Sequence, residues 1–194
     1  MGRIVVSENV SLDGVVQDPT GEEGFEFGGW FNRMPEQDRT EWGAFEYQEA
    51  LDTAAWLVGR GTYTWFEKRW GDRPGAWADR LRVVPKYVVS STLECPTGWG
   101  PTTVLRGDLA DEVTGLQERV DGDVVVYGSA PLAQALLAGD LVDELRLTVH
   151  PFVLGSGARM YGLTDAPRAL ERVAVRTFGS TLVHLTYQRA GTGE

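Results

Sequence analysis

Short strand-like runs alternate with helix-like segments along the first 140 residues of this chain, and this alternation limits the fold more than any other feature. Residues 3–10 and 123–127 are rich in β-branched residues and follow no helical period, which predicts strands. Between them, residues 39–54 repeat apolar side chains at helical intervals. A chain with this alternation covers a largely parallel sheet with helices, so the sequence predicts an α/β fold.

Local signals place the ends of several elements. Asp38 and Glu41 have the spacing of a capping box, which predicts that the first long helix starts at about Arg39. Asp108 is a good N-cap for a second helix, and a third is predicted over residues 131–138, with a proline in its first turn. Further short strands are predicted at 55–58, 86–91 and 102–106, and a short helix at 63–68.

The last third of the chain has a different pattern. Three strand-like runs follow one another with no helical segment between them, at 144–149, 170–178 and 181–188. Gly179-Ser180 is a hairpin signal, so this ending predicts antiparallel strands beside a parallel centre. A chain of 194 residues suits one core. We expect a single domain over residues 1–190 and a short tail at 191–194.

The charge of the chain argues against some classes of partner. The net charge of −10 disfavours nucleic-acid binding, because affinity for a phosphate backbone needs clustered Lys and Arg. The balance is uneven, however, since residues 59–106 carry 8 basic and 4 acidic side chains whereas residues 1–58 carry 3 and 12. The basic middle segment leaves room for one dinucleotide.

Other features argue against metal and membrane functions. One cysteine, Cys95, and two histidines, His150 and His184, are too few for a structural zinc site or an internal disulfide, so no metal is expected. No apolar run approaches the roughly 20 residues that span a bilayer. The N-terminus lacks a signal-peptide pattern. We therefore expect a cytoplasmic protein without a membrane partner.

Two strand–glycine–helix turns carry the clearest chemical signal. They lie at residues 57–62 and 126–132. Such a turn points backbone N–H groups and the positive end of a helix beyond the carboxyl edge of the sheet, where phosphates bind well. Neither turn matches the Rossmann or P-loop pattern, and simple turn geometry is the alternative for each. Arg60 adds a guanidinium that can hold a phosphate bidentately.

Several motifs, taken in order, make this chain resemble proteins of the dihydrofolate reductase-like fold. The resemblance is closer to the reductase domain of the bifunctional riboflavin-biosynthesis deaminase/reductase and its free-standing relatives. The resemblance extends from residue 3 to about residue 188. The motifs are Ser-Leu-Asp-Gly at 11–14, Leu-Val-Gly-Arg-Gly-Thr-Tyr at 57–63, Pro-Lys-Tyr-Val-Val-Ser-Ser at 85–91, Val-Tyr-Gly-Ser-Ala at 126–130, and the two runs 142–147 and 150–157.

The resemblance implies a mixed, mostly parallel sheet of about eight strands flanked by helices, with NADPH across the carboxyl ends of the central strands and with two subunits paired as a homodimer. By position, the residues expected at the 2′-phosphate and pyrophosphate are Gly59, Arg60 and Thr62. Those expected beside the adenosine phosphate are Ser90 and Ser91, and those expected under the pyrophosphate are Gly128, Ser129, Ala130 and Leu132.

The substrate side is less well defined. Dihydrofolate reductases carry a carboxylate in the first helix, and Glu46 and Glu49 lie in the corresponding region, although a solvated surface position is the alternative for both. Asp13, in the Ser-Leu-Asp-Gly motif, is the candidate catalytic residue for binding or proton donation, with a plain turn as its alternative. The aromatic side chains Trp30, Phe31, Trp42 and Phe45 could stack on a planar heterocycle or pack in the core.

The sequence therefore predicts an NADPH-dependent reductase that transfers hydride to a small planar heterocycle of pterin or pyrimidine type. The deaminase half of the bifunctional enzyme, with its zinc motif, is absent from this chain. A non-catalytic nucleotide- or ligand-binding module with the same fold is the alternative function, since fold alone does not establish activity. An interaction domain without cofactor is a third reading, and the two glycine turns together with Arg60 argue against it.

Overall fold

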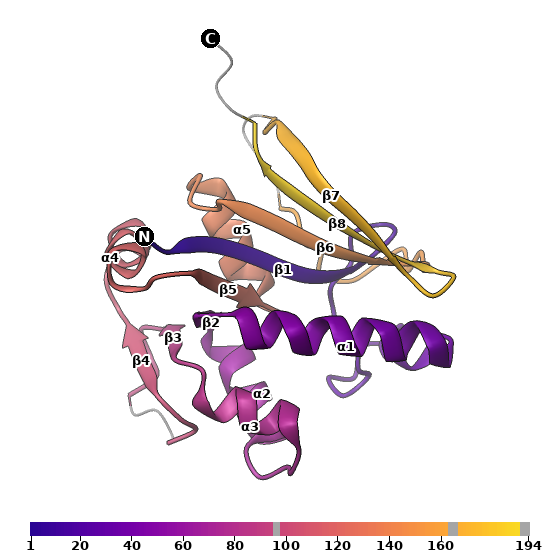
Figure 1. The fold of residues 1–194 in the computed structure, drawn as a ribbon, viewed down its shortest axis with the longest axis horizontal. Coiled ribbons are helices and arrows are strands. Elements are labelled where there is room, and N and C mark those ends of the chain that lie inside the picture. Colours follow the sequence, from indigo (N-terminus) through magenta and orange to yellow (C-terminus); the bar gives the residue numbers. More distant parts are fainter. Residues whose placement is uncertain (95–97, 163–166, 191–194) are drawn as a thin grey trace.

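The computed structural model describes residues 1–94, 98–162 and 167–190, so Cys95 and the expected tail at 191–194 lie outside the described residues. Figure 1 shows how the strands and helices are arranged. The strands are β1 (Arg3–Ser11), β2 (Ala55–Gly59), β3 (Lys86–Val89), β4 (Thr102–Leu105), β5 (Asp123–Tyr127), β6 (Glu144–His150), β7 (Leu170–Phe178) and β8 (Leu182–Arg189). The helices are α1 (Glu36–Asp52), α2 (Arg60–Trp70), α3 (Ala76–Val83), α4 (Leu109–Arg119) and α5 (Ala130–Ala138), with a short 3₁₀ turn, η1 (Trp30–Arg33).

All eight strands form one sheet in the order β4-β3-β2-β5-β1-β6-β8-β7. The pairings from β4 to β6 are parallel, whereas β8 is antiparallel to both β6 and β7. In Figure 1 the sheet extends from β4 at one edge to the β7–β8 hairpin at the other. The predicted α/β class, the parallel centre and the antiparallel C-terminal hairpin are confirmed.

Both faces of the parallel centre are buried, which explains the apolar runs in its strands. On β1, Ile4 and Val6 join a core that includes residues of α4 and α5, whereas Val5 joins a second core with residues of α2 and α3. Side chains alternate between the faces of a strand, so a single strand supplies both cores. The sheet is thereby fixed between two helical layers. No helix within the described residues is long and apolar enough to cross a membrane.

The predicted capping box at the start of α1 is wrong. The helix begins at Glu36 after Pro35, with no side-chain cap. The carboxylate of Asp38 instead accepts hydrogen bonds from the backbone N–H groups of Ser180 and Thr181, at 3.1 and 2.9 Å, and from the Thr181 hydroxyl. The turn between β7 and β8 has amides without strand partners, and the buried carboxylate from α1 accepts their hydrogen bonds.

Two other elements differ from the sequence prediction. Helix α2 starts at Arg60, directly after the glycine turn, whereas a short helix at 63–68 was expected. Helix α3 was not predicted, because Pro74 and Gly75 precede it and only Ala78 and Leu81 of its eight residues are buried. Strand β3 ends at Val89, so Ser90 and Ser91 follow the strand and do not belong to it.

We expect Asp38→Ala to lower the thermal midpoint of unfolding, because the variant leaves the amides of the β7–β8 turn without acceptors. Amide hydrogen exchange at Ser180 and Thr181 should also become faster than in the wild-type protein. Gln48→Ala, at an exposed position of the same helix, is the control and should leave both measurements unchanged. An unaltered midpoint for Asp38→Ala would show that the turn does not depend on α1.

Candidate active site

A cavity of about 1120 Å³ opens beyond the carboxyl end of β5. Strand β5 ends at Tyr127, opposite Ser7, while β1 continues to Ser11 alongside β6. The side chains of Glu8 and Asn9 therefore reach space that the shorter neighbouring strand does not fill. The walls come from β1, residues 16–23 of the first loop, helices α1 and α2, and the turn into α5. Ligands of open α/β sheets bind at such carboxyl ends.

The two glycine turns lie side by side, because β2 and β5 are neighbours in the sheet. The Gly59 N–H donates to the Ser129 hydroxyl at 3.0 Å, and Ser129 donates to the Thr62 hydroxyl at 2.8 Å. Thr62 in turn donates to the carbonyl oxygen of Gly128 at 2.9 Å. Four residues predicted from two distant motifs thus form one hydrogen-bonded chain at the edge of the cavity.

The N-termini of α2 and α5 lack a cap from their own N-cap side chains, although the Glu8 carboxyl contacts the Gly128 and Ser129 amides. Their N-cap residues, Gly59 and Ser129, make no side-chain cap to the first turn of either helix. The N–H groups of a first helical turn have no partner inside the helix, so a pair of uncapped N-termini suits a ligand with phosphate groups. Thr62 and Ala130 belong to these first turns and line the cavity. The donor set fits the phosphates of a dinucleotide.

The other predicted cofactor residues lie outside the cavity lining. The exposed Arg60 donates to the Thr92 hydroxyl at 2.7 Å, and the Ser90 hydroxyl accepts from the Thr92 N–H at 3.2 Å. Arg60 and Ser90 are therefore linked through one residue, and Ser91 is exposed beside them. Leu132 belongs to α5, and its side chain is buried in the core. Only its backbone is therefore available to a ligand.

Asp13 is engaged in holding a loop. Its carboxylate accepts from the Ser11 hydroxyl at 2.7 Å and from the N–H groups of Leu154 and Gly155 at 3.1 and 2.8 Å. The hydrogen bond from Ser11, followed by those from the two amides, lowers the pKa of Asp13 to about 2. Arg159 also contacts this residue. Asp13 does not line the cavity, and these contacts favour a role in fixing residues 154–155 against β1.

Glu46 lines the cavity from α1. The Trp42 indole N–H donates to its Oε1 at 3.0 Å, and the side chain of Asn9 also donates to the carboxyl. Burial, and then the negative charge of Glu49, raises the pKa of Glu46 to about 8. This carboxyl is therefore protonated over much of the neutral pH range and can supply a proton to a bound molecule.

Glu8 was missed by sequence reasoning. It is buried on β1, lines the cavity, and its Oε1 has no hydrogen-bond partner. Burial raises its pKa to about 8, although contacts with the Ser129 and Gly128 amides oppose this shift. The available signal was a glutamate within an apolar strand, where a charged residue requires a partner or a function.

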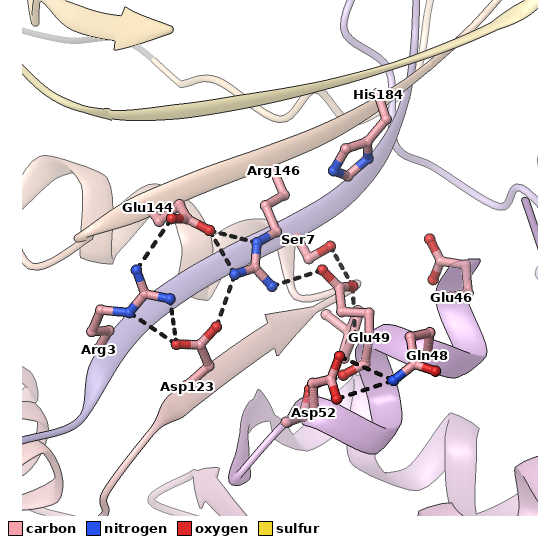
Figure 2. A network of polar contacts seen from close by, with 12 residues as sticks. Arg3, Ser7, Glu46, Gln48, Glu49, Asp52, Asp123, Glu144, Arg146 and His184 are labelled. Carbon is pink, nitrogen blue, oxygen red and sulfur yellow. Dashed lines mark hydrogen bonds and ion pairs between the residues drawn. The ribbon is translucent and has the colours of Figure 1, made fainter. Parts of the chain in front are cut away.

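Glu49 belongs to a buried ionic network (Figure 2) and does not itself line the cavity. Its Oε1 accepts from Arg146 at 3.0 Å, and its Oε2 accepts from the Ser7 and Tyr127 hydroxyls at 2.8 and 2.7 Å. Arg146 also pairs with Asp123 at 2.8 Å. Both oxygens of Glu49 are thus held by hydrogen bonds, which leaves Glu46 as the carboxyl of α1 that lines the cavity.

The predicted aromatic cluster divides between cavity and core. Phe31 and Trp42 line the cavity. Trp30 is buried and packs edge-on against His150, with ring centroids 4.8 Å apart, whereas Phe45 packs on Phe178. Burial lowers the pKa of His150 to about 3, so the imidazole that bonds to Asn9 at 2.9 Å is neutral. Within the described residues, no cluster of three or more His, Cys, Asp or Glu could hold a metal ion.

Solved structures share this fold. The putative riboflavin biosynthesis protein from Shewanella sp. PV-4 is 22% identical, with a TM-score of 0.76 over 97% of this chain and 99% of the other. Dihydrofolate reductase from Enterococcus faecalis, complexed with NADP(H) and RAB-propyl, is 16% identical, with a TM-score of 0.60 over 97% of each chain. The diaminohydroxyphosphoribosylaminopyrimidine deaminase/5-amino-6-(5-phosphoribosylamino)uracil reductase of Thermotoga maritima is 15% identical, with a TM-score of 0.64 over 97% of this chain and 57% of its own.

Sequence comparison gives the family directly. The uncharacterized protein YyaP of Bacillus subtilis strain 168 is 27% identical over 198 residues, which cover 97% of this chain and 96% of YyaP. The family model of the RibD C-terminal domain matches residues 3–184. The resemblance inferred from the motifs is confirmed, and the chain belongs to the RibD C-terminal domain family.

Proposed function

We propose that this protein is an NADPH-dependent reductase that transfers hydride to a small planar heterocycle of pyrimidine or pterin type, and that it works in the cytoplasm. The observation that carries the proposal is the cavity itself, which joins two uncapped helix N-termini to an aromatic wall with a protonated carboxyl. Reductases of the same fold, one of them solved with NADP(H), support the reaction class.

The residues of the two glycine turns would hold the phosphate-bearing half of NADPH, with Arg60 at the 2′-phosphate. Ser90 and Ser91 would lie at the adenosine side, next to Arg60 through Thr92. The amides that open α2 are already oriented, whereas a phosphate at α5 would have to displace the Glu8 carboxyl from the Gly128 and Ser129 amides. NADPH, when bound, supplies the hydride.

On the substrate side, this chain's own residues orient the heterocycle and supply a proton. Phe31 and Trp42 present aromatic surface to a planar ring. The carboxyl of Glu46, held by Trp42 and Asn9, lies in the same cavity and would donate the proton that accompanies hydride transfer.

Arg60→Ala tests the cofactor assignment. Loss of a guanidinium from a phosphate should weaken NADPH binding by about 10-fold or more while leaving the dissociation constant for NADH nearly unchanged. Quenching of tryptophan emission by each nucleotide measures both constants. Arg119→Ala, at an exposed position on α4, is the matched control. An unchanged ratio of the two constants would remove Arg60 from the cofactor site.

The pH dependence of activity tests Glu46. An acid with a pKa of about 8 is active when protonated, so kcat/KM should be high at neutral pH and fall as the pH rises through about 8. Glu46→Gln should lower kcat by about 100-fold and abolish this alkaline fall. NADPH oxidation, followed by absorbance with a panel of pterins and pyrimidines, provides the assay.

Asp13→Asn, measured in the same assay, decides between the two carboxyls. Because Asp13 bonds to the loop amides, the variant should retain the alkaline fall of kcat/KM that belongs to Glu46. If Asp13→Asn loses this fall and Glu46→Gln retains it, Asp13 is the proton donor.

One observation favours the alternative of a binding module without turnover. The carboxyl of Glu8 already contacts the Gly128 and Ser129 amides, which are two of the donors expected for the pyrophosphate. Saturable binding of NADPH without its oxidation by any member of the heterocycle panel would support this alternative over the reductase.

We also propose that two copies pair through β7. This edge strand is exposed along Leu170–Thr177, including the apolar side chains of Val173 and Val175, which are 49% and 48% exposed. Such an edge is a template for pairing with another chain. Sedimentation should give about twice the chain mass of 21.3 kDa, and Val175→Lys should give a monomer. A wild-type mass of one chain at micromolar concentration would contradict this expectation.

A further inference from the structure

The end of strand β5 places Glu8 of β1 beside the turn that opens α5. The pairing of β1 with β5 stops at Ser7 and Tyr127, so Glu8 has no partner on β5. Gly128 follows Tyr127 directly, and its φ of 57° turns the chain away from the sheet. On this side of β1, Glu8 therefore lies next to the Gly128–Ser129 turn.

The start of α5 offers few backbone donors to a ligand. Ser129, its N-cap, makes no side-chain cap, and its hydroxyl is bonded instead to Gly59 and Thr62. Pro131, in the first turn of this nine-residue helix, has no N–H. The amides of Gly128 and Ser129 are therefore a large part of what this helix N-terminus can present to an anion.

The Glu8 carboxyl contacts these two amides. The residue is only 6% exposed, yet it lines the cavity, and its Oε1 has no hydrogen-bond partner. A carboxylate and a phosphate are both anionic acceptors, and backbone N–H groups at a helix N-terminus suit either of them. Glu8 and a ligand phosphate thus compete for the same donors.

Negative charge on Glu8 has little compensation nearby. Arg39 of α1 donates to two backbone carbonyl oxygens, and Arg69 of α2 pairs with a glutamate of the first loop. Tyr127 of β5 stays neutral, because burial raises the pKa of its phenol well above the usual value. The other acidic residues of the described cavity lining are Glu46 of α1 and Asp18, Glu22 and Glu23 of the first loop.

Protonation changes what Glu8 offers to an anion. Burial raises its pKa to about 8, although the two amide contacts oppose this shift. A phosphate bound next to Glu8 would add negative charge, which favours the neutral form of the carboxyl further. The neutral carboxyl also has an O–H that can donate to a phosphate oxygen. One proton therefore removes the competition for the amides and adds a donor.

We propose that the dinucleotide binds to the protonated form of Glu8: a phosphate replaces the Glu8 carboxyl at the Gly128 and Ser129 amides, and the O–H of Glu8 donates to that phosphate. Where Glu8 is ionised in the free protein, it takes up one proton from the solvent as the nucleotide binds. The inference rests on the proposed cofactor site and does not depend on turnover. It makes the affinity for the nucleotide fall as the pH rises.

Titration calorimetry of the wild-type protein with NADP⁺ at pH 7 and pH 9 tests this link. With a pKa of about 8 for free Glu8, we expect the dissociation constant to be about 10-fold larger at pH 9. The second ionisation of a phosphate lies at about pH 6, so the 2′-phosphate contributes little to this change. Titrations at pH 9 in two buffers of different ionisation enthalpy should show the uptake of close to one proton. Equal dissociation constants without proton uptake would overturn the inference.

Glu8→Gln, Glu46→Gln and Glu118→Gln identify the group that takes up the proton. Glu8→Gln is neutral at every pH, so it should bind NADP⁺ at pH 9 about 10-fold more tightly than the wild-type protein and lose the pH dependence. Glu46→Gln removes the other carboxyl of the cavity with a raised pKa and should keep the weakening at pH 9. Glu118→Gln, exposed on α4, is the matched control and should behave like the wild-type protein.

Circular dichroism establishes that each variant is folded. If folded Glu8→Gln retains the pH dependence, or if Glu46→Gln abolishes it, Glu8 is not the proton acceptor and the inference fails. If Glu8→Gln does not fold, the proton uptake of the wild-type protein and of Glu46→Gln decides the question. Substrate kinetics are measured at saturating NADPH, so nucleotide affinity does not affect the alkaline fall of kcat/KM assigned to Glu46.

The outcomes separate this inference from the proposed function. If NADP⁺ binds with proton uptake at Glu8 but no heterocycle is reduced, the reductase proposal fails while the link to Glu8 stands. If NADP⁺ binds equally well at both pH values, the link fails while the cofactor assignment stands. If neither NADP⁺ nor NADPH binds at pH 7, the cofactor assignment fails and this inference fails with it.

Discussion

The ionic network around Arg146 holds the substrate side of the molecule together. Its guanidinium binds Glu49 of α1, Asp123 of β5 and Glu144 of its own strand, so one side chain ties a helix to two strands. Buried charges are costly unless their hydrogen bonds are complete, and here the carboxylate of Glu49 also accepts from two hydroxyls. Removing Arg146 would leave the carboxylate of Glu49 without a cation, whereas Asp123 and Glu144 would still pair with Arg3. The place of α1 on the sheet, and hence the wall of the cavity, depends on this contact.

Much of the fold follows from patterns that act over short distances. Apolar β-branched runs gave the strands, and Gly179-Ser180 gave the C-terminal hairpin, because burial and turn geometry leave local traces in a sequence. The start of α1 was predicted wrongly because Asp38 can satisfy amides either in its own helix or in a distant turn. Which of the two it meets depends on tertiary packing, and no local rule contains that information.

In the candidate site, too, some residues could be predicted from local sequence patterns and others could not. The hydrogen-bonded chain through Gly59, Thr62 and Ser129 was foreseeable, because the carboxyl ends of parallel strands meet at one edge of a sheet. Glu8 was not, since its importance comes from β1 extending past the end of β5, and strand lengths across a sheet are a property of the assembled fold. The contacts of Asp13 with a loop some 140 residues away were equally invisible to local patterns.

Helix α1 is anchored near both ends, by Asp38 to the β7–β8 turn and by Glu49 to the centre of the sheet. The two anchors are separated by roughly 16 Å along the helix axis, at 1.5 Å per residue. Glu46 lies between these two anchors. Helix α1 is continuous from one anchor to the other, as Figure 1 shows. The carboxyl therefore cannot approach or withdraw from a ligand by a local movement of its backbone. Any adjustment at that wall of the cavity has to come from the incoming molecule or from the loops opposite.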